Sequence, residues 1–240
     1  MLAASEIKCN LCGGTEFEDV KSRPKVKCRS CRSVERTRLL WMYLQEVDFR
    51  PDTRVLHLAP ERGLYRKLSK LLTPENYVCS DINPKRYKFV ENIIKLDLCD
   101  LDAQLSGEYD LIIHSHVMEH VPCNFAYTLF HLHRMLKPAG KQICIIPFGR
   151  GKYDECFQDI SDEERTRRFG QHDHVRRFGA EDRHAHLGSI VSLPAEFDAK
   201  ARFGAERLRQ ANIPQKAWTG FTPNTVLILS KDDLRLKTAT

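Results

Sequence analysis

Apolar residues along the chain alternate between short continuous runs and longer stretches in which they recur every three or four positions. The runs predict strands at residues 54–59, 77–79, 93–96, 109–114 and 142–147, and the spaced stretches predict helices at 33–47, 63–72 and 125–136. A polar segment at 148–203 shows neither pattern, and a predicted helix at 205–210 and strand at 225–229 follow it. Because strands and helices alternate, we expect an α/β fold with a parallel, doubly wound sheet that is covered on both faces.

Composition narrows the class of protein. A chain of 240 residues has room for one domain of ordinary size and a small appendage. Hydrophobic residues make up 42% and charged residues 29%, which is typical of soluble globular proteins, and no apolar stretch is long enough to cross a membrane. The net charge of +6 favours anionic partners, but many soluble enzymes carry as much, so charge alone selects no function.

The N-terminal region contains two Cys-x-x-Cys pairs, Cys9 with Cys12 and Cys28 with Cys31. Each pair can present two thiolates to one ion, and a tetrahedral Zn²⁺ site needs four such ligands. The segment between the pairs has too few apolar residues to fold by itself, so a metal would supply its stability. We therefore predict a small zinc ribbon with these four cysteines as ligands.

Disulfide bonds are the alternative use of these cysteines. They would be expected in an exported protein, but residues 1–8 lack the basic flank and the long apolar stretch of an export signal. We therefore expect a cytoplasmic protein. The five other cysteines are scattered and lie mostly in apolar runs, so they are predicted to be reduced core residues: Cys79, Cys99, Cys123, Cys144 and Cys156.

The turn after the first predicted sheet strand indicates the kind of cofactor. Ligands of doubly wound sheets bind beyond the carboxyl ends of the strands, and a dinucleotide needs glycines there for close approach of the pyrophosphate. This turn reads Ala59, Pro60 and Glu61, which removes an N–H donor and adds a negative charge. S-adenosylmethionine has no phosphate and carries cationic groups, so it suits an acidic turn better. Asp81, after the second strand, could accept from both ribose hydroxyls, and Asp97, after the third, could face the adenine amino group.

The motifs in this region resemble those of class I S-adenosylmethionine-dependent methyltransferases. They are His-Leu-Ala-Pro-Glu at 57–61, Ser-Asp-Ile-Asn-Pro at 80–84, Asp-Leu-Cys-Asp-Leu at 97–101, Glu-His-Val-Pro at 119–122 and Leu-Lys-Pro-Ala-Gly at 136–140. The resemblance spans roughly residues 54–148 and implies a Rossmann-like seven-stranded sheet and methyl transfer. The chain departs from the usual glycine-rich first motif at Ala59 and Pro60.

Candidate site residues follow from these motifs. The cofactor-binding candidates lie at the carboxyl ends of the strands: His57, Ala59, Pro60, Glu61, Asp81, Ile82, Asp97, Leu98, Ser115 and His116. Histidine is the usual base near neutral pH, and the candidate bases are His116, His172 and His174. The first lies beside His120 after the fourth strand, and the other two lie in the polar segment. The substrate-binding candidates are Asp173, Arg176 and Arg177, the arginines because their paired N–H groups can bind a carboxylate or a phosphate.

These observations predict a zinc ribbon at 1–33, a linking helix at 34–50 and a methyltransferase domain at 51–240, with a substrate-side insertion at about 149–204. The predicted function is methyl transfer to a small-molecule or sugar-type acceptor, more at oxygen than at carbon, with no membrane partner. One alternative is an RNA methyltransferase whose basic ribbon binds nucleic acid, although the ribbon has few aromatic residues for stacking on bases. Another is a binding protein without catalysis on the same fold.

Overall fold

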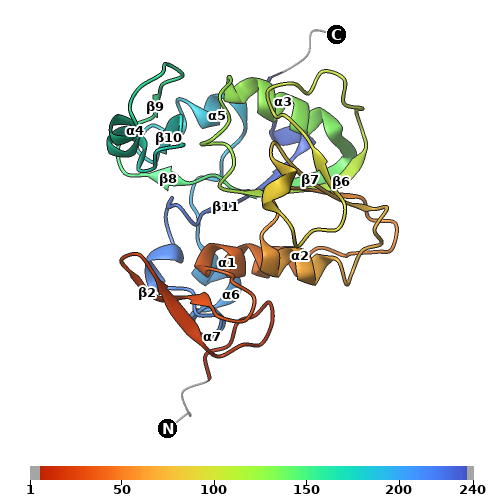
Figure 1. The fold of residues 1–240 in the computed structure, drawn as a ribbon, viewed down its shortest axis with the longest axis vertical. Coiled ribbons are helices and arrows are strands. Elements are labelled where there is room, and N and C mark those ends of the chain that lie inside the picture. The colour runs from red at the N-terminus through yellow and green to blue at the C-terminus, as the bar shows by residue number, and fades with distance from the viewer. Residues whose placement is uncertain (1–5, 237–240) are drawn as a thin grey trace.

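A six-stranded, mostly parallel sheet forms the centre of the computed structural model, which describes residues 6–236 (Figure 1). Its strands run in the order β5, β4, β3, β6, β7, β11, and β11 is antiparallel to β7. They comprise β3 (Val55–Leu58), β4 (Tyr77–Asp81), β5 (Ile93–Lys95), β6 (Tyr109–Ser115), β7 (Leu136–Ile145) and β11 (Val226–Ser230). The predicted Rossmann-like α/β fold is confirmed. The described residues give six strands in this sheet instead of the seven implied by the resemblance, because the chain between β7 and β11 folds outside it.

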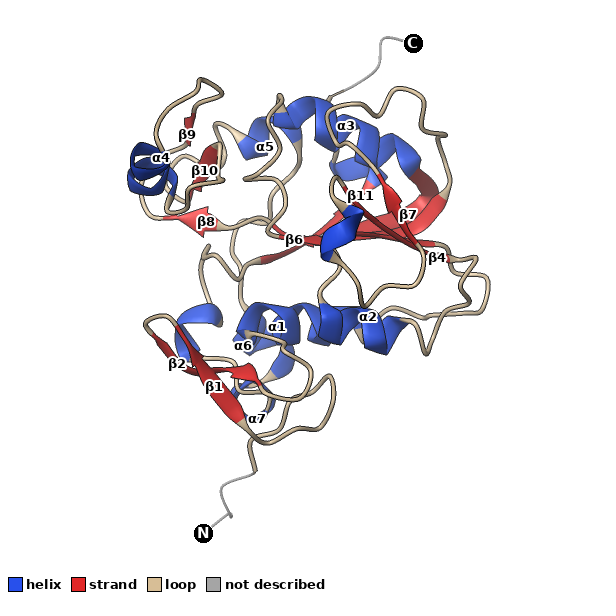
Figure 2. Ribbon diagram, viewed as in Figure 1, coloured by secondary structure: helices blue, strands red, loops and turns tan. Residues whose placement is uncertain are grey.

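Helices cover both faces of the sheet (Figure 2). Helices α1 (Glu35–Leu44) and α2 (Arg62–Leu68) lie on one face, and α3 (Phe125–Met135) lies on the other. Neighbouring residues of a strand point to opposite faces, so Ile113 packs in the core with α1 and α2, and Ile112 packs in the core with α3. Both faces are buried, which explains why the central strands read as continuous apolar runs.

The N-terminal ribbon consists of β1 (Phe17–Val20) and β2 (Arg23–Cys28), an antiparallel pair that shares its core with the rest of the chain. It lies beside α1, α6 (Ala199–Phe203) and α7 (Ala205–Gln210) (Figure 1). The buried guanidinium of Arg38, on α1, donates to the carbonyls of Ser33, Ala211 and Asn212 and so joins these parts. Gly63, in α2, touches the ribbon, because a Cβ there would lie 3.2 Å from the Cys31 sulfur.

The polar segment between β7 and β11 contains elements that the apolar pattern does not reveal. Three short strands form a second sheet in the order β8 (Phe148–Gly149), β10 (Arg176–Gly179), β9 (Asp154–Glu155). Helices α4 (Asp162–Phe169) and α5 (Leu187–Ile190) flank it, and short 3₁₀ turns occur elsewhere at η1 (Pro84–Arg86), η2 (Gln215–Ala217) and η3 (Lys231–Asp233). Together these strands and helices form the lobe above the ribbon in Figure 2.

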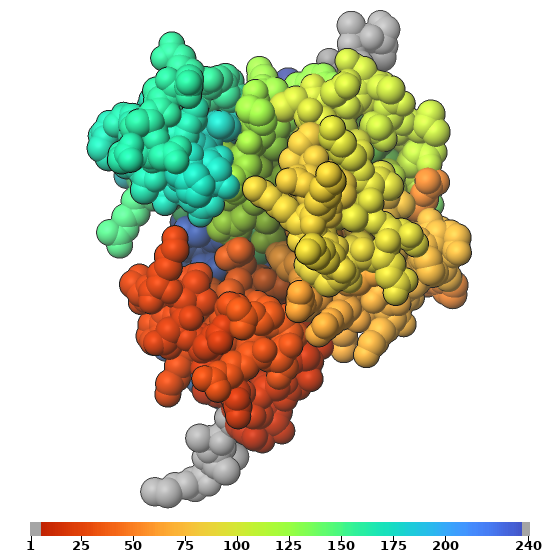
Figure 3. Space-filling model, viewed as in Figure 1, coloured from red at the N-terminus to blue at the C-terminus, as the bar shows by residue number. Residues whose placement is uncertain are grey.

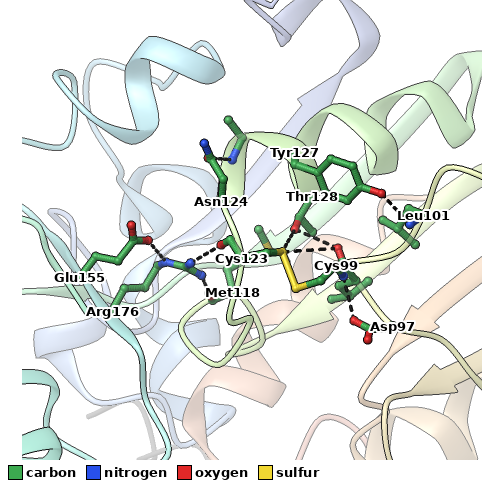
Figure 4. Close-up of a disulfide and its surroundings, with 12 residues drawn as sticks. Asp97, Cys99, Leu101, Met118, Cys123, Asn124, Tyr127, Thr128, Glu155 and Arg176 are labelled. Carbon is green, nitrogen blue, oxygen red and sulfur yellow. Dashed lines mark hydrogen bonds and ion pairs between the residues drawn. A yellow bond between two sulfur atoms is a disulfide. The ribbon is translucent and has the colours of Figure 1, made fainter. Parts of the chain in front are cut away.

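Two of the cysteines correct a prediction. Cys99, after β5, and Cys123, after β6, form a disulfide with 5.7 Å between their Cα atoms (Figure 4). Both are only half-buried, so the expectation that all five scattered cysteines are reduced core residues is wrong for this pair, whereas Cys79 and Cys144 are free and buried. Within residues 6–236, none of the helices combines the length and the apolar character that a membrane span requires.

Candidate active site

The carboxyl ends of β3 and β6 lie side by side, and each is followed by a residue with a left-handed backbone. Ala59 has φ 48° and His116 has φ 56°. Residues other than glycine rarely adopt this backbone conformation, and those that do are often found at functional sites. Ala59 thus takes a backbone conformation that favours glycine, so the departure from a glycine-rich first motif changes the side chain more than the path of the chain.

A buried carboxylate follows this turn. His57, on β3, is fully buried, and its Nδ1 lies 2.7 Å from the Tyr77 hydroxyl while its Nε2 lies 3.3 Å from Glu61 Oε2. Burial acts to raise the pKa of Glu61, but the hydrogen bond and charge of His57 outweigh it, so the pKa is lowered. Glu61 Oε1 is buried without a hydrogen-bond partner. His57 therefore holds Glu61, and the free carboxylate oxygen can accept from a cationic ligand group.

The next two strand ends carry the predicted ribose and adenine contacts. Asp81 accepts from the Asn83 amide at 2.7 Å and from the Tyr87 hydroxyl at 2.8 Å, which fixes its carboxylate and leaves further lone pairs. Ile82 beside it is 53% exposed, an apolar surface next to a carboxylate. Asp97 is exposed and accepts from the Cys99 amide. The remaining cofactor candidates at these strand ends are buried or half-buried: Pro60, Leu98 and Ser115.

The structure brings together histidines that lie far apart in the sequence. The rings of His120, after β6, and His174, before β10, are 4.6 Å apart. A backbone hydrogen bond from the Val175 amide to the Glu119 carbonyl, between the residues next to these histidines, joins the insertion to the segment that follows β6. His172, on the same segment, is exposed and does not belong to this cluster. Asp173 approaches His120, with Oδ2 3.4 Å from its Nδ1.

His116 occupies the boundary between this cluster and solvent. Its Nε2 donates to the Pro223 carbonyl at 2.8 Å, and its Nδ1 lies 3.1 Å from Glu119 Oε1. Glu119 is 1% exposed. Burial acts to raise its pKa, but the neighbouring His116 outweighs this and the pKa is lowered, so the carboxylate is ionised near neutral pH.

The two arginines predicted to bind substrate are engaged with protein instead. Arg176 is fully buried and donates to the carbonyls of Met118 and Cys123 and to the Glu155 carboxylate (Figure 4). Arg177 donates to two backbone carbonyls of the insertion. The guanidinium of Arg176 is therefore not accessible to a substrate. Its contacts join the insertion to the loop that follows β6.

A cavity of about 460 Å³ opens between the ribbon and the insertion (Figure 3). His116 and Gly149 lie on its wall, and it also contains three basic residues that sequence reasoning missed: Arg36, Arg150 and Lys216. These come from three distant segments, so no local motif could reveal them. Arg23 and Glu35 also line it, but they pair with one another. Neither Asp81 nor Ile82 lines this cavity, so it lies to one side of the predicted nucleoside contacts.

The four ribbon cysteines form a cluster with the geometry of a tetrahedral site. Sulfur–sulfur distances are 3.5 Å for Cys9 with Cys31 and for Cys12 with Cys28, and all four sulfurs lie within 4.8 Å of one another. Four thiolates at about 2.3 Å from one Zn²⁺ would be about 3.8 Å apart. The donors therefore fit zinc in both number and spacing.

The fold and this site together define a Rossmann-like α/β enzyme with carboxylates at the carboxyl edge of its sheet. The family comparison makes the class specific. The chain belongs to the methyltransferase domain family, whose model matches residues 36–186, and it is an S-adenosylmethionine-dependent methyltransferase.

Solved structures with a similar fold include three that cover most of this chain. The YcgJ protein from Bacillus subtilis is 13% identical over 75% of this chain and 80% of its own, with a TM-score of 0.46. A putative methyltransferase from Bacillus halodurans is 14% identical over 74% and 79%, with a TM-score of 0.47. A SAM-dependent methyltransferase from Archaeoglobus fulgidus is 17% identical over 80% and 92%, with a TM-score of 0.45. No curated protein matches the chain.

Proposed function

We propose that this methyltransferase acts on a hydroxyl oxygen of a small-molecule or sugar-type acceptor that carries an anionic group. The observation that carries the proposal is the cavity beside His116, which has the size of a small-molecule site and holds Arg36, Arg150 and Lys216. Three cations that line one cavity favour a carboxylate or phosphate on the acceptor.

The residues that would hold S-adenosylmethionine lie at the neighbouring strand ends. The free oxygen of Glu61 suits the cationic amino group, the carboxylate of Asp81 suits the ribose hydroxyls, and the exposed side chain of Ile82 suits the adenine face. The other cofactor candidates at these strand ends would lie around the same donor site. When bound, this donor supplies an electrophilic methyl carbon, to which the acceptor oxygen bonds as the carbon–sulfur bond breaks and the hydroxyl proton leaves to a base.

We assign the base to His116. Its Nε2–H is held by the Pro223 carbonyl, so Nδ1 is the nitrogen that takes up a proton, and the Glu119 carboxylate 3.1 Å away would stabilise the resulting imidazolium. His120 and His174 also lie beside Glu119, each with a ring nitrogen within 4.8 Å of one of its carboxylate oxygens. His172 is exposed and lies outside this arrangement, so we do not keep it as a base.

The basic ribbon gives little support to an RNA substrate. Four of its basic side chains are paired with acidic neighbours: Arg23 with Glu35, Lys27 with Glu18, Arg29 with Glu16 and Arg32 with Glu18. Three carboxylates therefore compensate part of the charge of these four cations, two of them on the ribbon and Glu35 on α1. We propose instead that residues 1–33 form a zinc-stabilised wall of the acceptor cavity. The linking segment 34–50, whose helix α1 spans Glu35–Leu44, would attach it to the catalytic part of the chain, 51–240.

Calorimetric titration with S-adenosylhomocysteine tests the donor site. Wild type should bind it, and Asp81→Asn, which keeps the shape and removes the charge, should bind at least about tenfold more weakly. Asp52→Asn is the matched control, because its carboxylate is 81% exposed and pairs with Arg50 at the surface, away from the predicted donor contacts. Folded wild type that does not bind this product would refute the donor site, and equal binding by Asp81→Asn would refute the ribose assignment.

A further inference from the structure

We propose that Glu119, His120 and His174 form a second metal site, for a divalent cation of the Mn²⁺, Fe²⁺ or Zn²⁺ kind. One ligand atom from each residue lies within 4.8 Å of the other two. Donors at about 2.1 Å from one metal lie about 3.0–3.4 Å apart in octahedral or tetrahedral coordination. Side-chain movement of up to about 1 Å would therefore bring the three donors around one ion.

The carboxylate of this cluster is buried and only partly compensated. Glu119 is 1% exposed, and His116 Nδ1 lies 3.1 Å from Oε1, whereas Oε2 is buried without a hydrogen-bond partner. An ionised carboxylate without hydrogen bonds is costly in a protein interior unless a cation compensates it. An ion shared with the two histidines would supply that compensation.

The two histidines are oriented as metal ligands usually are. His174 Nδ1 lies 3.0 Å from the Phe169 carbonyl, and His120 Nδ1 lies 3.3 Å from the Asp173 carbonyl and 3.4 Å from its carboxylate. These oxygens can only accept, so each Nδ1 carries the proton and each Nε2 keeps a free lone pair. Metal-binding histidines typically donate their second N–H to a carbonyl or carboxylate in this way, which fixes the ring.

The donor set separates this site from the ribbon. Two imidazoles and a carboxylate suit borderline divalent cations and leave positions open for water or substrate, whereas four thiolates form a closed site selective for Zn²⁺. His116, the neighbour of Glu119, lines the acceptor cavity. If the proposed function holds, the acceptor oxygen can complete the coordination, and its hydroxyl would lose a proton more readily for that reason.

Binding of Mn²⁺ to the full chain tests the site without any measurement of turnover. Free Mn²⁺ is followed by electron paramagnetic resonance while protein that holds one Zn²⁺ per chain, the amount that the four thiolates bind, is titrated. Zn²⁺ content is checked throughout, because a second Zn²⁺ would occupy the proposed site in preference to Mn²⁺. We expect one bound Mn²⁺ per chain in wild type. Glu119→Gln and His174→Asn should each weaken binding at least about tenfold, whereas His172→Asn, at an exposed histidine two residues away, should bind as wild type does.

Two results would overturn the inference: folded wild type that binds no Mn²⁺ at about 1 mM, or binding of equal strength in wild type, Glu119→Gln and His174→Asn. If Glu119→Gln does not fold, His120→Asn replaces it, because His120 is partly exposed. S-adenosylhomocysteine binding is measured on the same samples. Wild type that binds S-adenosylhomocysteine but no Mn²⁺ counts against the metal site alone, and wild type that binds Mn²⁺ but no S-adenosylhomocysteine counts against the donor site alone.

Discussion

Arg176 offers a direct test of whether the insertion is joined to the site through buried hydrogen bonds. The substitution is Arg176→Met, which keeps an unbranched apolar stem and removes all five N–H donors. In the structure, these donors serve the carbonyls of Met118 and Cys123 and the Glu155 carboxylate, and the side chain is fully buried. The variant therefore leaves two interior carbonyls without a donor.

The expected cost can be worked out from these contacts. Each hydrogen bond from a charged group to a buried carbonyl contributes about 1.5–3 kcal/mol, so the two together contribute about 3–6 kcal/mol. The Glu155 side chain is 27% exposed and keeps its hydrogen bond from the Tyr153 hydroxyl. Loss of the ion pair between Arg176 and Glu155 therefore adds less than about 1 kcal/mol to the destabilisation. Removing the guanidinium also removes its desolvation cost, and Met gains apolar burial, which offsets about 1–3 kcal/mol. The net destabilisation is about 3 kcal/mol.

Thermal and urea denaturation measure this change. For a chain of this size, about 3 kcal/mol corresponds to a Tm lower by about 6–12 °C. Arg167→Met is the matched control, because Arg167 has a 72% exposed side chain and a surface ion pair, so its loss should cost less than about 0.5 kcal/mol. A Tm for Arg176→Met equal to that of the control, together with a raised KM for the acceptor, would refute the reasoning and restore Arg176 as a substrate ligand.

Three further outcomes are expected. Cys28→Ser should lose stoichiometric Zn²⁺ and lower the Tm by more than about 10 °C, because the ribbon shares its core with α1; retained Zn²⁺ at an unchanged Tm would contradict this. Gly179→Ala should destabilise the chain by at least about 2 kcal/mol in urea denaturation, because a Cβ there would lie 2.3 Å from the backbone carbon of Lys152; a change below about 0.5 kcal/mol would contradict it. The pKa of Asp154 is lowered chiefly by its hydrogen bond from Arg168, so its stabilisation is complete above about pH 4 and disappears as the pH falls through the lowered value. The difference in unfolding free energy between wild type and Asp154→Asn should therefore be larger at about pH 6 than at about pH 3, and equal differences would contradict it.

The apolar pattern predicted the central sheet because the burial of each strand depends on its own residues. The run at 109–114 corresponds to β6 and the helix at 205–210 corresponds to α7, with at most one residue of difference at an end. Such elements bury apolar side chains wherever the rest of the chain lies, so local spacing is sufficient to find them. Asp81, Glu61 and His116 could be proposed for the same reason, because parallel strands bring their carboxyl ends to one edge.

The rest of the site depends on pairing between segments that are distant in the sequence. Strands β8, β9 and β10 have two to four residues each, too few for any periodic signal, and they form because they pair with one another. That pairing places His174 against His120, and no local feature of either residue indicates the other. The disulfide between Cys99 and Cys123 escaped prediction in the same way, because their separation of 24 residues carries no information about the approach of two loops.

A repeated pentapeptide shows how strongly such context acts. Arg-Phe-Gly-Ala-Glu occurs at 177–181, where its first three residues belong to strand β10, and again at 202–206, where it spans the end of α6 and the start of α7. Glycine is required at both places, but for opposite reasons. Gly179 has ordinary backbone angles and no room for a Cβ, whereas Gly204 has open space around it and φ 79° with ψ 146°, a conformation that side chains avoid. The flanking phenylalanines also pack in different cores, Phe178 against Phe125 and Phe203 against Tyr43. The same residues therefore form a strand or a helix junction according to the partners that the surrounding chain supplies. The geometry of the His120 and His174 cluster likewise depends on contacts between distant segments.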